Sequence, residues 1–166
     1  MTGVLDGYGI SATLPTGWEG RIMRRAAPVV GPVAAAPLPE GSPDEHMHPV
    51  VHLANFALPP NRGDYGSGAV DIMGGNHALI VLFEFGRESV GTALFRANGM
   101  PRTLRPSRFA PEALQRRLPG QLGYQRFFTE AGRAFSLFVV LGGTRQADRL
   151  CTHCNDVLAA TRIEPS

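Results

Sequence analysis

Three histidines occur at even-numbered positions in the segment PDEHMHPVVH (43–52): His46, His48 and His52. In an extended chain, residues two and six positions apart project to the same side, so three imidazoles could converge on one cation. Catalytic zinc sites use three protein ligands and leave the fourth position open for water or substrate. One interpretation is therefore a metal-dependent enzyme, or a metal-binding protein, with zinc as the metal.

The alternative is a polar loop that leads into a strand, with no resident cofactor. Pro49 separates His48 from His52, and the apolar pattern of the strand begins only at Val50. A strand that begins there places only His52 on a regular element, on its exposed face, and leaves His46 and His48 in the loop. Both interpretations remain open at this point.

A second candidate site is the arginine-rich stretch 96–117, which holds six arginines and Glu112 as its only acidic residue. Guanidinium groups bind carboxylates and phosphates in a bidentate manner. The interleaved prolines predict that this stretch is largely non-helical and exposed. A simple solvated surface is the alternative to a binding surface. The candidate binding residues are Arg102, Arg105, Arg108, Arg116 and Arg117.

Two further motifs carry reactive or charged groups. In the CTHC motif (151–154), Cys151 and Cys154 fall inside a helical pattern, whereas a redox CxxC motif needs its first thiolate at a helix N-terminus. We therefore expect both thiols to face the core. Glu84 lies in a strand that is apolar on both faces, so it needs a partner, and Arg126 or Arg133 is the expected one.

The composition is typical of a soluble globular chain that forms one domain over residues 1–166. The 166 residues carry a formal net charge of +2, which is too small to favour a nucleic-acid or membrane surface. No secretory signal is visible, and the longest apolar runs are far shorter than a membrane helix. We expect a cytoplasmic protein with a protein or small anionic partner and an open oligomeric state.

The hydrophobic periodicity predicts grouped strands rather than strict alternation with helices. This order favours an α+β fold with a mainly antiparallel sheet, and strands that are apolar on both faces predict a three-layer α/β/α sandwich. A Pro/Ala-rich mobile loop is expected at 26–49. The predicted strands are 7–15 with 18–25 pairing back on it, 50–58, 77–85, a hairpin of 124–130 with 134–142, and 161–165; the predicted helices are 69–73, 88–97, 111–118 and 145–159.

Three segments together resemble the Mog1/PsbP-like fold, and in particular its LpqN-type actinobacterial members. They are ISATLPTGWEG (10–20), RFFTEAGRAFSLFVVLGG (126–143) and VLAATRI (157–163). The resemblance covers both ends of the chain better than the middle, and its motifs are packing motifs. It implies a role as a binding or assembly partner, with no catalytic residues to carry over.

Overall fold

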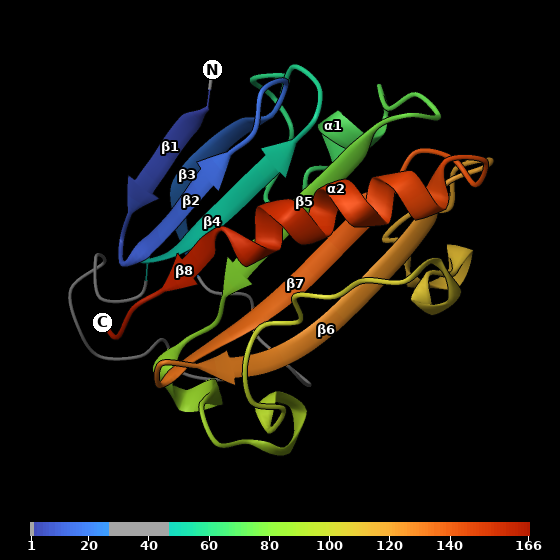
Figure 1. Ribbon diagram of the computed structural model, residues 1–166. Helices are drawn as coiled ribbons and strands as arrows, with labels where there is room; N and C mark the ends of the chain where they lie inside the picture. The colour runs from blue at the N-terminus through green and yellow to red at the C-terminus, as the bar shows by residue number, and fades with distance from the viewer. Residues whose placement is uncertain (1, 27–46) are drawn as a thin grey trace.

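Two antiparallel sheets are the framework of the protein, and a computed structural model describes residues 2–26 and 47–166 (Figure 1). The five-stranded sheet has the order β3 (Glu19–Ala26), β4 (Met47–Ala54), β5 (Ala78–Glu84), β7 (Arg133–Leu141) and β6 (Leu122–Glu130). The three-stranded sheet has the order β1 (Gly3–Gly7), β2 (Ile10–Leu14) and β8 (Thr161–Ile163). The helices are α1 (Ser67–Val70), α2 (Ala147–Ala159) and the 3-10 turns η2 (Arg87–Ser89), η3 (Ala93–Phe95), η4 (Pro106–Arg108) and η5 (Pro111–Ala113).

The larger sheet separates two buried clusters. Successive side chains of a strand point to opposite faces, and β5 and β7 are buried along their whole length. Ile80 of β5 and Val139 of β7 therefore join one cluster, whereas Val81 and Val140 join the other. This arrangement confirms the prediction that both strands are central in the sheet.

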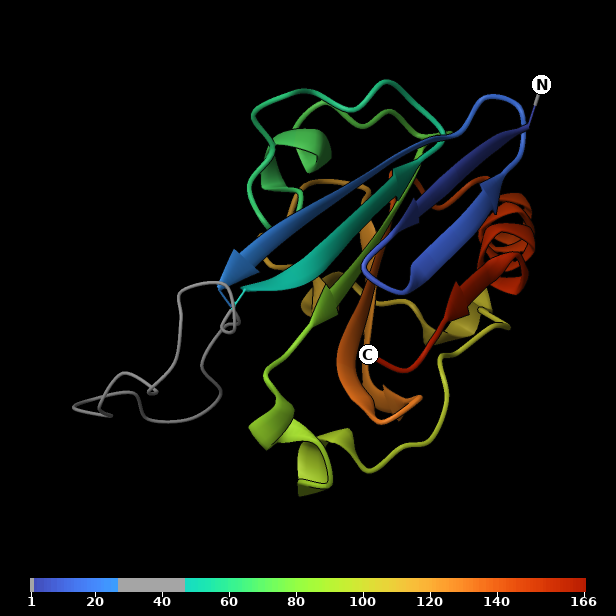
Figure 2. The same cartoon turned by 90° about the vertical axis from the view of Figure 1, so that its left-hand side faces the viewer.

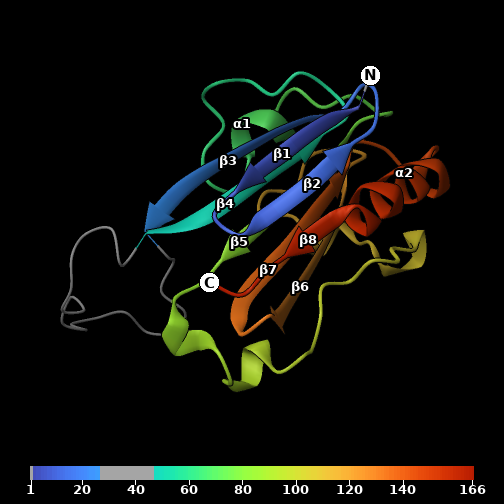
Figure 3. The ribbon, with the colours of Figure 1, turned by 60° about the vertical axis from the view of Figure 1, so that its left-hand side comes forward.

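The two faces of the larger sheet are covered differently. The smaller sheet and α2 lie over one face, and α1 with its irregular connections lies over the other (Figure 2). Figure 3 shows β1, β2 and β8 side by side in front of β3, β4 and β5. The α+β class with antiparallel sheets is confirmed. The three-layer α/β/α sandwich is not confirmed, because the helical elements that residues 2–26 and 47–166 place on the second face are a four-residue helix and 3-10 turns.

The predicted strand 7–15 is observed only as β2, which begins at Ile10, and β1 before it was not predicted. Tyr8 and Gly9 take positive φ values of 54° and 73°, which suits a two-residue hairpin turn between β1 and β2. The predicted pairing of the next strand was also wrong: β3 pairs with β4, whereas β2 pairs with β1 and β8. The two sheets pack closely at Gly20, where a Cβ would lie 2.9 Å from side-chain carbons of Leu5 and Leu14.

Other boundaries differ from the expectation. The ends of the expected loop 26–49 belong to strands, because β3 includes Ala26 and β4 begins at Met47; residues 27–46 lie outside the described residues. The predicted helices 88–97 and 111–118 are only 3-10 turns. The first is broken at Gly91, which takes a φ of 81°, and the second ends at Leu114, which is extended with its side chain buried.

Residues 122–163 follow the prediction most closely. The β6–β7 hairpin turns at Ala131 and Gly132, which both have positive φ values. Along α2, the 3.6-residue stripe that includes Leu150, Cys151 and Cys154 is buried against the sheet. None of the helices in the described ranges has the length and apolar character needed to cross a bilayer.

Candidate functional site

His52 lies on β4 and is fully buried, which corrects the expectation of an exposed position. Its Nε2 lies 2.7 Å from the carbonyl oxygen of Asp64, and its Nδ1 accepts a hydrogen bond of 2.7 Å from Nε of Arg62. Nδ1 carries no proton because it accepts from Arg62, and Nε2 carries the proton because its partner is a carbonyl oxygen. We therefore assign the neutral tautomer that is protonated on Nε2. Both ring nitrogens are therefore engaged within the protein.

Burial lowers the pKa of His52 to about 4, and its hydrogen bond to Asp64 offsets only part of this effect. The positive charge of Arg62 acts in the same direction as burial. The pKa of Arg62 is itself lowered by burial and then by the nearby charges of Arg21 and Arg25. His52 is therefore uncharged, and its Nδ1 accepts the hydrogen bond that holds the guanidinium of Arg62 near Arg21 and Arg25.

The described residues do not bring the predicted metal ligands together. Because β4 begins at Met47 and not after Pro49, His48 and His52 share one face of the strand, with His48 opposite Arg25. Four residues of strand separate them by about 13 Å, which is too far for one cation. Within residues 2–26 and 47–166, no three His, Cys, Asp or Glu side chains are grouped to hold a metal. His46 lies outside the described residues.

Arg102 is bonded to the end of α2, although its side chain remains 38% exposed. Its Nη1 donates to the carbonyl oxygens of Leu158 and Thr161, the latter at 2.7 Å. Its Nη2 lies 3.5 Å from a carboxylate oxygen of Glu130. Carbonyl groups at a helix C-terminus lack intrahelical partners, and a cation there also interacts favourably with the helix dipole. Arg102 therefore serves the fold.

The rest of this stretch is also held more firmly than its prolines suggested. Asn155 of α2 accepts a hydrogen bond of 2.6 Å from the amide of Leu104 and donates one of 3.2 Å to its carbonyl. Met100, Leu104 and Phe109 are buried in the cluster beneath α2. The stretch thus contributes to the core and holds its exposed side chains in fixed places.

The remaining four candidate arginines fall into two groups. Arg116 pairs with Asp71, and Arg117 pairs with Glu112 at 2.8 Å, in exposed ion pairs that contribute little to stability. Arg105, which precedes η4, and Arg108, the last residue of η4, are both exposed. Their side chains make no hydrogen bond or ion pair with the described residues. The structure therefore separates this second pair from the other predicted binding residues.

Arg126 of β6 joins Arg108 beside an aromatic pair. The rings of Phe109 and Tyr124 are 5.5 Å apart between centroids. Arg126 shares a face of β6 with Tyr124, and Arg108 precedes Phe109 in the chain. Burial raises the pKa of Tyr124, and the positive charges of Arg126 and Arg108 oppose that rise. We call Arg108, Phe109, Tyr124 and Arg126 the basic–aromatic patch. The sequence signal for Arg126 was its place on an alternating strand, but it was considered only as a partner for Glu84.

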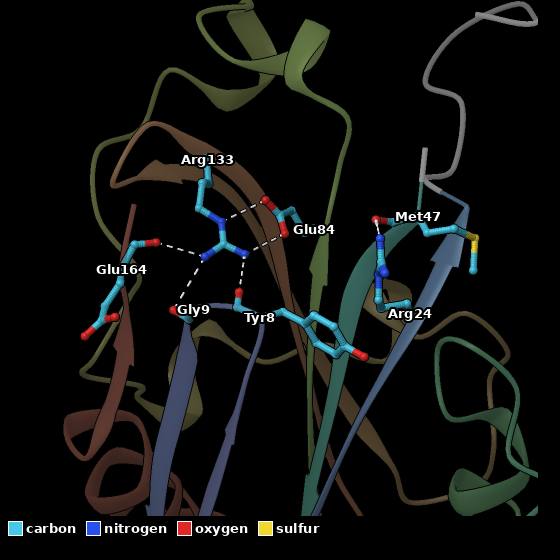
Figure 4. Close-up of polar contacts among 7 residues, drawn as sticks. All are labelled: Tyr8, Gly9, Arg24, Met47, Glu84, Arg133 and Glu164. Carbon is cyan, nitrogen blue, oxygen red and sulfur yellow. Dashed lines mark hydrogen bonds and ion pairs between the residues drawn. The ribbon is translucent and has the colours of Figure 1, made fainter. Parts of the chain in front are cut away.

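Glu84 pairs with Arg133, which was one of its two predicted partners, and not with Arg126 (Figure 4). Nε and Nη2 of Arg133 donate to the two carboxylate oxygens at 2.8 and 2.7 Å. The same guanidinium donates to the carbonyl oxygens of Tyr8, Gly9 and Glu164. This buried network joins the β1–β2 turn and the C-terminal segment to β5 and β7.

The CTHC motif is structural, as its helical pattern predicted. Cys151 and Cys154 are buried, and burial raises the pKa of both thiols, that of Cys151 to about 11. His153, between them, lines an open cleft of about 290 Å³ together with Trp18 and Asp156. The thiols are therefore protonated at neutral pH and do not face this cleft.

Comparison of the chain with models of protein families, with curated protein sequences and with solved structures gave no match. The resemblance to the Mog1/PsbP-like fold therefore stays a prediction, and the functional argument depends on the chain's own geometry.

Proposed function

We propose that this protein is a non-enzymatic binding or assembly domain whose basic–aromatic patch recognises an acidic group of a protein partner or a small anion. One observation carries the proposal. Arg108 precedes Phe109, whose ring contacts that of Tyr124, and Arg126 lies on the same face of β6 as Tyr124. Neither guanidinium has an ion-pair partner among the described residues. The exposed Arg116 and Arg117, in contrast, are already paired with carboxylates.

The patch has properties that favour binding. Its backbone is fixed by the two hydrogen bonds between Leu104 and Asn155 and by the buried ring of Phe109, so little conformational entropy is lost when a ligand docks. Guanidinium groups present forked donors to carboxylates and phosphates. Arginine and tyrosine are also enriched among the residues that dominate binding energy at protein interfaces.

Binding of a fluorescently labelled polyglutamate peptide, followed by anisotropy, tests the proposal. We expect binding that weakens as salt is raised from about 20 to about 150 mM, because exposed charges are screened over that range. An Arg105→Glu/Arg108→Glu variant should lose at least about tenfold in affinity, since reversal also adds repulsion.

The matched control is Arg145→Glu/Arg149→Glu, which reverses two exposed arginines near the start of α2 and gives the same net charge. The control should retain the affinity of the wild-type protein more closely. Equal losses in the two double variants would show that only net charge matters, and the patch would no longer be the proposed binding surface.

The alternative function is a metal-dependent enzyme that uses His46, His48 and His52. It requires the ring of His52 to give up at least one of its two hydrogen bonds and to become accessible. Metal analysis of protein purified without an affinity tag distinguishes the two proposals. Close to one equivalent of zinc, lost in a His46→Ala/His48→Ala variant, would replace the binding-domain proposal.

A further inference from the structure

The outer edge of β6 exposes backbone groups as well as arginine side chains. In an antiparallel strand, the backbone amide and carbonyl of one residue both point to the neighbouring strand on one side, and those of the next residue point to the other side. The amide of Gly123 donates outward to the carbonyl of Ala110 at 3.0 Å, and that of Thr129 donates outward to the carbonyl of Ala97 at 2.8 Å. The backbone amides and carbonyls of the odd-numbered residues of β6 therefore point away from β7.

Gln125 and Phe127 lie between these two occupied positions. By the same alternation, their amides and carbonyls point outward, and neither residue has a backbone partner on that side within the described part of the chain. We call residues 124–128 the edge window. It spans about 13 Å, which is enough for a short strand of an incoming chain.

The two faces of the edge window differ in character. Tyr124 and Arg126 project to the face that carries α2, where Arg108 also lies. Phe127 projects to the opposite face, is half-buried, and packs edge-to-face against the ring of Phe95 at 5.5 Å between centroids. A strand added at this edge would meet positive charge on one face and an aromatic surface on the other.

We propose that an extended, acidic segment of a protein partner adds to β6 at the edge window as a short extra strand. Its main chain pairs with the amides and carbonyls of Gln125 and Phe127, a mode in which backbone hydrogen bonds give affinity and alternate side chains give specificity. The segment alternates acidic residues, on the Arg126 side, with apolar residues, on the Phe127 side. This inference rests on the proposed function and specifies the form of the partner.

A second copy of the protein is a poorer occupant of the same edge. Pairing two copies of β6 would bring Arg108 and Arg126 of one copy towards those of the other. Like charges on paired strands are destabilising, and like-charge juxtaposition across an interface disfavours association. Charge complementarity therefore selects an acidic peptide.

The test uses a labelled hexapeptide of alternating aspartate and valine as the probe, with the full-length protein and anisotropy as the readout. Gln125→Pro removes one outward backbone amide but no backbone hydrogen bond to β7, and proline is tolerated at such edge positions. Gln125→Ala is its control, because both variants lose the 3.1 Å hydrogen bond that the side-chain amide of Gln125 donates to the hydroxyl of Ser136. We expect Gln125→Ala to bind within about twofold of wild type and Gln125→Pro to bind about fivefold to tenfold more weakly.

A second arm leaves the protein unchanged and so does not depend on folding of the proline variant. A probe in which every second backbone amide is N-methylated keeps its charge but loses the N–H donors along one edge of the extended peptide. For one of the two methylation registers, we expect binding to wild type to weaken about tenfold. If both registers and Gln125→Pro bind like the parent, while Arg105→Glu/Arg108→Glu still weakens binding, strand addition is wrong and the proposed function survives.

Two other results would overturn the inference. Polyglutamate that binds as tightly per charge as the alternating probe would show that no strand is formed. Concentration-dependent dimerisation in sedimentation experiments, abolished by Gln125→Pro, would assign the edge to a second copy.

Discussion

Arg133 and Arg108 present the same side chain in opposite environments. Arg133 is 4% exposed and donates five hydrogen bonds, two of them to the carboxylate of Glu84. Arg108 is exposed and makes no side-chain hydrogen bond or ion pair with the described residues. Tertiary structure thus uses the donors of one guanidinium and leaves those of the other available. We infer that the first serves stability and the second serves binding.

The largest expected effect comes from breaking the Arg133 network. An Arg133→Met variant leaves the carboxylate of Glu84 buried without its partner, so the free energy of unfolding should fall by about 3–5 kcal/mol. Urea unfolding followed by circular dichroism measures this change. An Arg133→Met/Glu84→Met variant should be destabilised by less than the sum of the two single substitutions, because the pair acts as a unit. A loss below about 1 kcal/mol for Arg133→Met would contradict the structural role.

The next effect tests His52, the other buried polar group held by an arginine. Its pKa of about 4 in the folded state lies below the value of 6.5 expected for an unfolded histidine. The unfolded chain therefore binds the proton first on acidification, and stability is lost as the pH falls from about 6.5 to about 4, with no further loss from this group below that. The expected contribution is about 3 kcal/mol.

Urea unfolding at several pH values, compared between wild type and His52→Gln, isolates this contribution from the other histidines. The difference in unfolding free energy between the two proteins should shrink as the pH falls through that range. A difference that stays constant with pH would show that His52 is not held neutral in the folded state.

A smaller effect separates Arg102 from Arg108 within one stretch of sequence. Arg102→Met removes the donors to the carbonyls of Leu158 and Thr161, so unfolding should become easier by about 1.5–3 kcal/mol. Arg108→Met should change stability by no more than about 0.5 kcal/mol. Thermal and urea unfolding of the two variants check the contrast, and equal losses would refute the division of the stretch into structural and binding arginines.

Much of the fold could be predicted from periodicity, because long elements carry a strong pattern. The stripe of α2 and the doubly apolar β5 and β7 were clear in the sequence. The N-terminal pairing was not, because the positive φ at Tyr8, a residue that rarely adopts it, hides a hairpin turn inside an alternating run. Proline-rich stretches likewise concealed a segment that contributes Leu104 to the core.

The candidate site was less predictable, because it depends on contacts between distant segments. Arg102 and Arg108 look alike in sequence, but only Arg102 comes near the end of α2. The arginine stretch gave no indication that the ring of Phe109, next to Arg108, would contact Tyr124, which shares a face of β6 with Arg126. The burial of His52 follows from Arg62 and Asp64, which lie in a connection without a strong pattern.

The most direct test of the binding role follows the guanidinium groups themselves. In two-dimensional NMR spectra of ¹⁵N-labelled protein, the Nε–H resonances of Arg108 and Arg126 should shift as the acidic probe is added. Those of Arg102 and Arg133 should not move, because the guanidinium groups of both residues are already held within the fold, Arg102 through Nη1 and Arg133 through Nε. Shifts spread evenly over all exposed arginines, or none at Arg108 and Arg126, would contradict the assignment of the basic–aromatic patch as the binding surface.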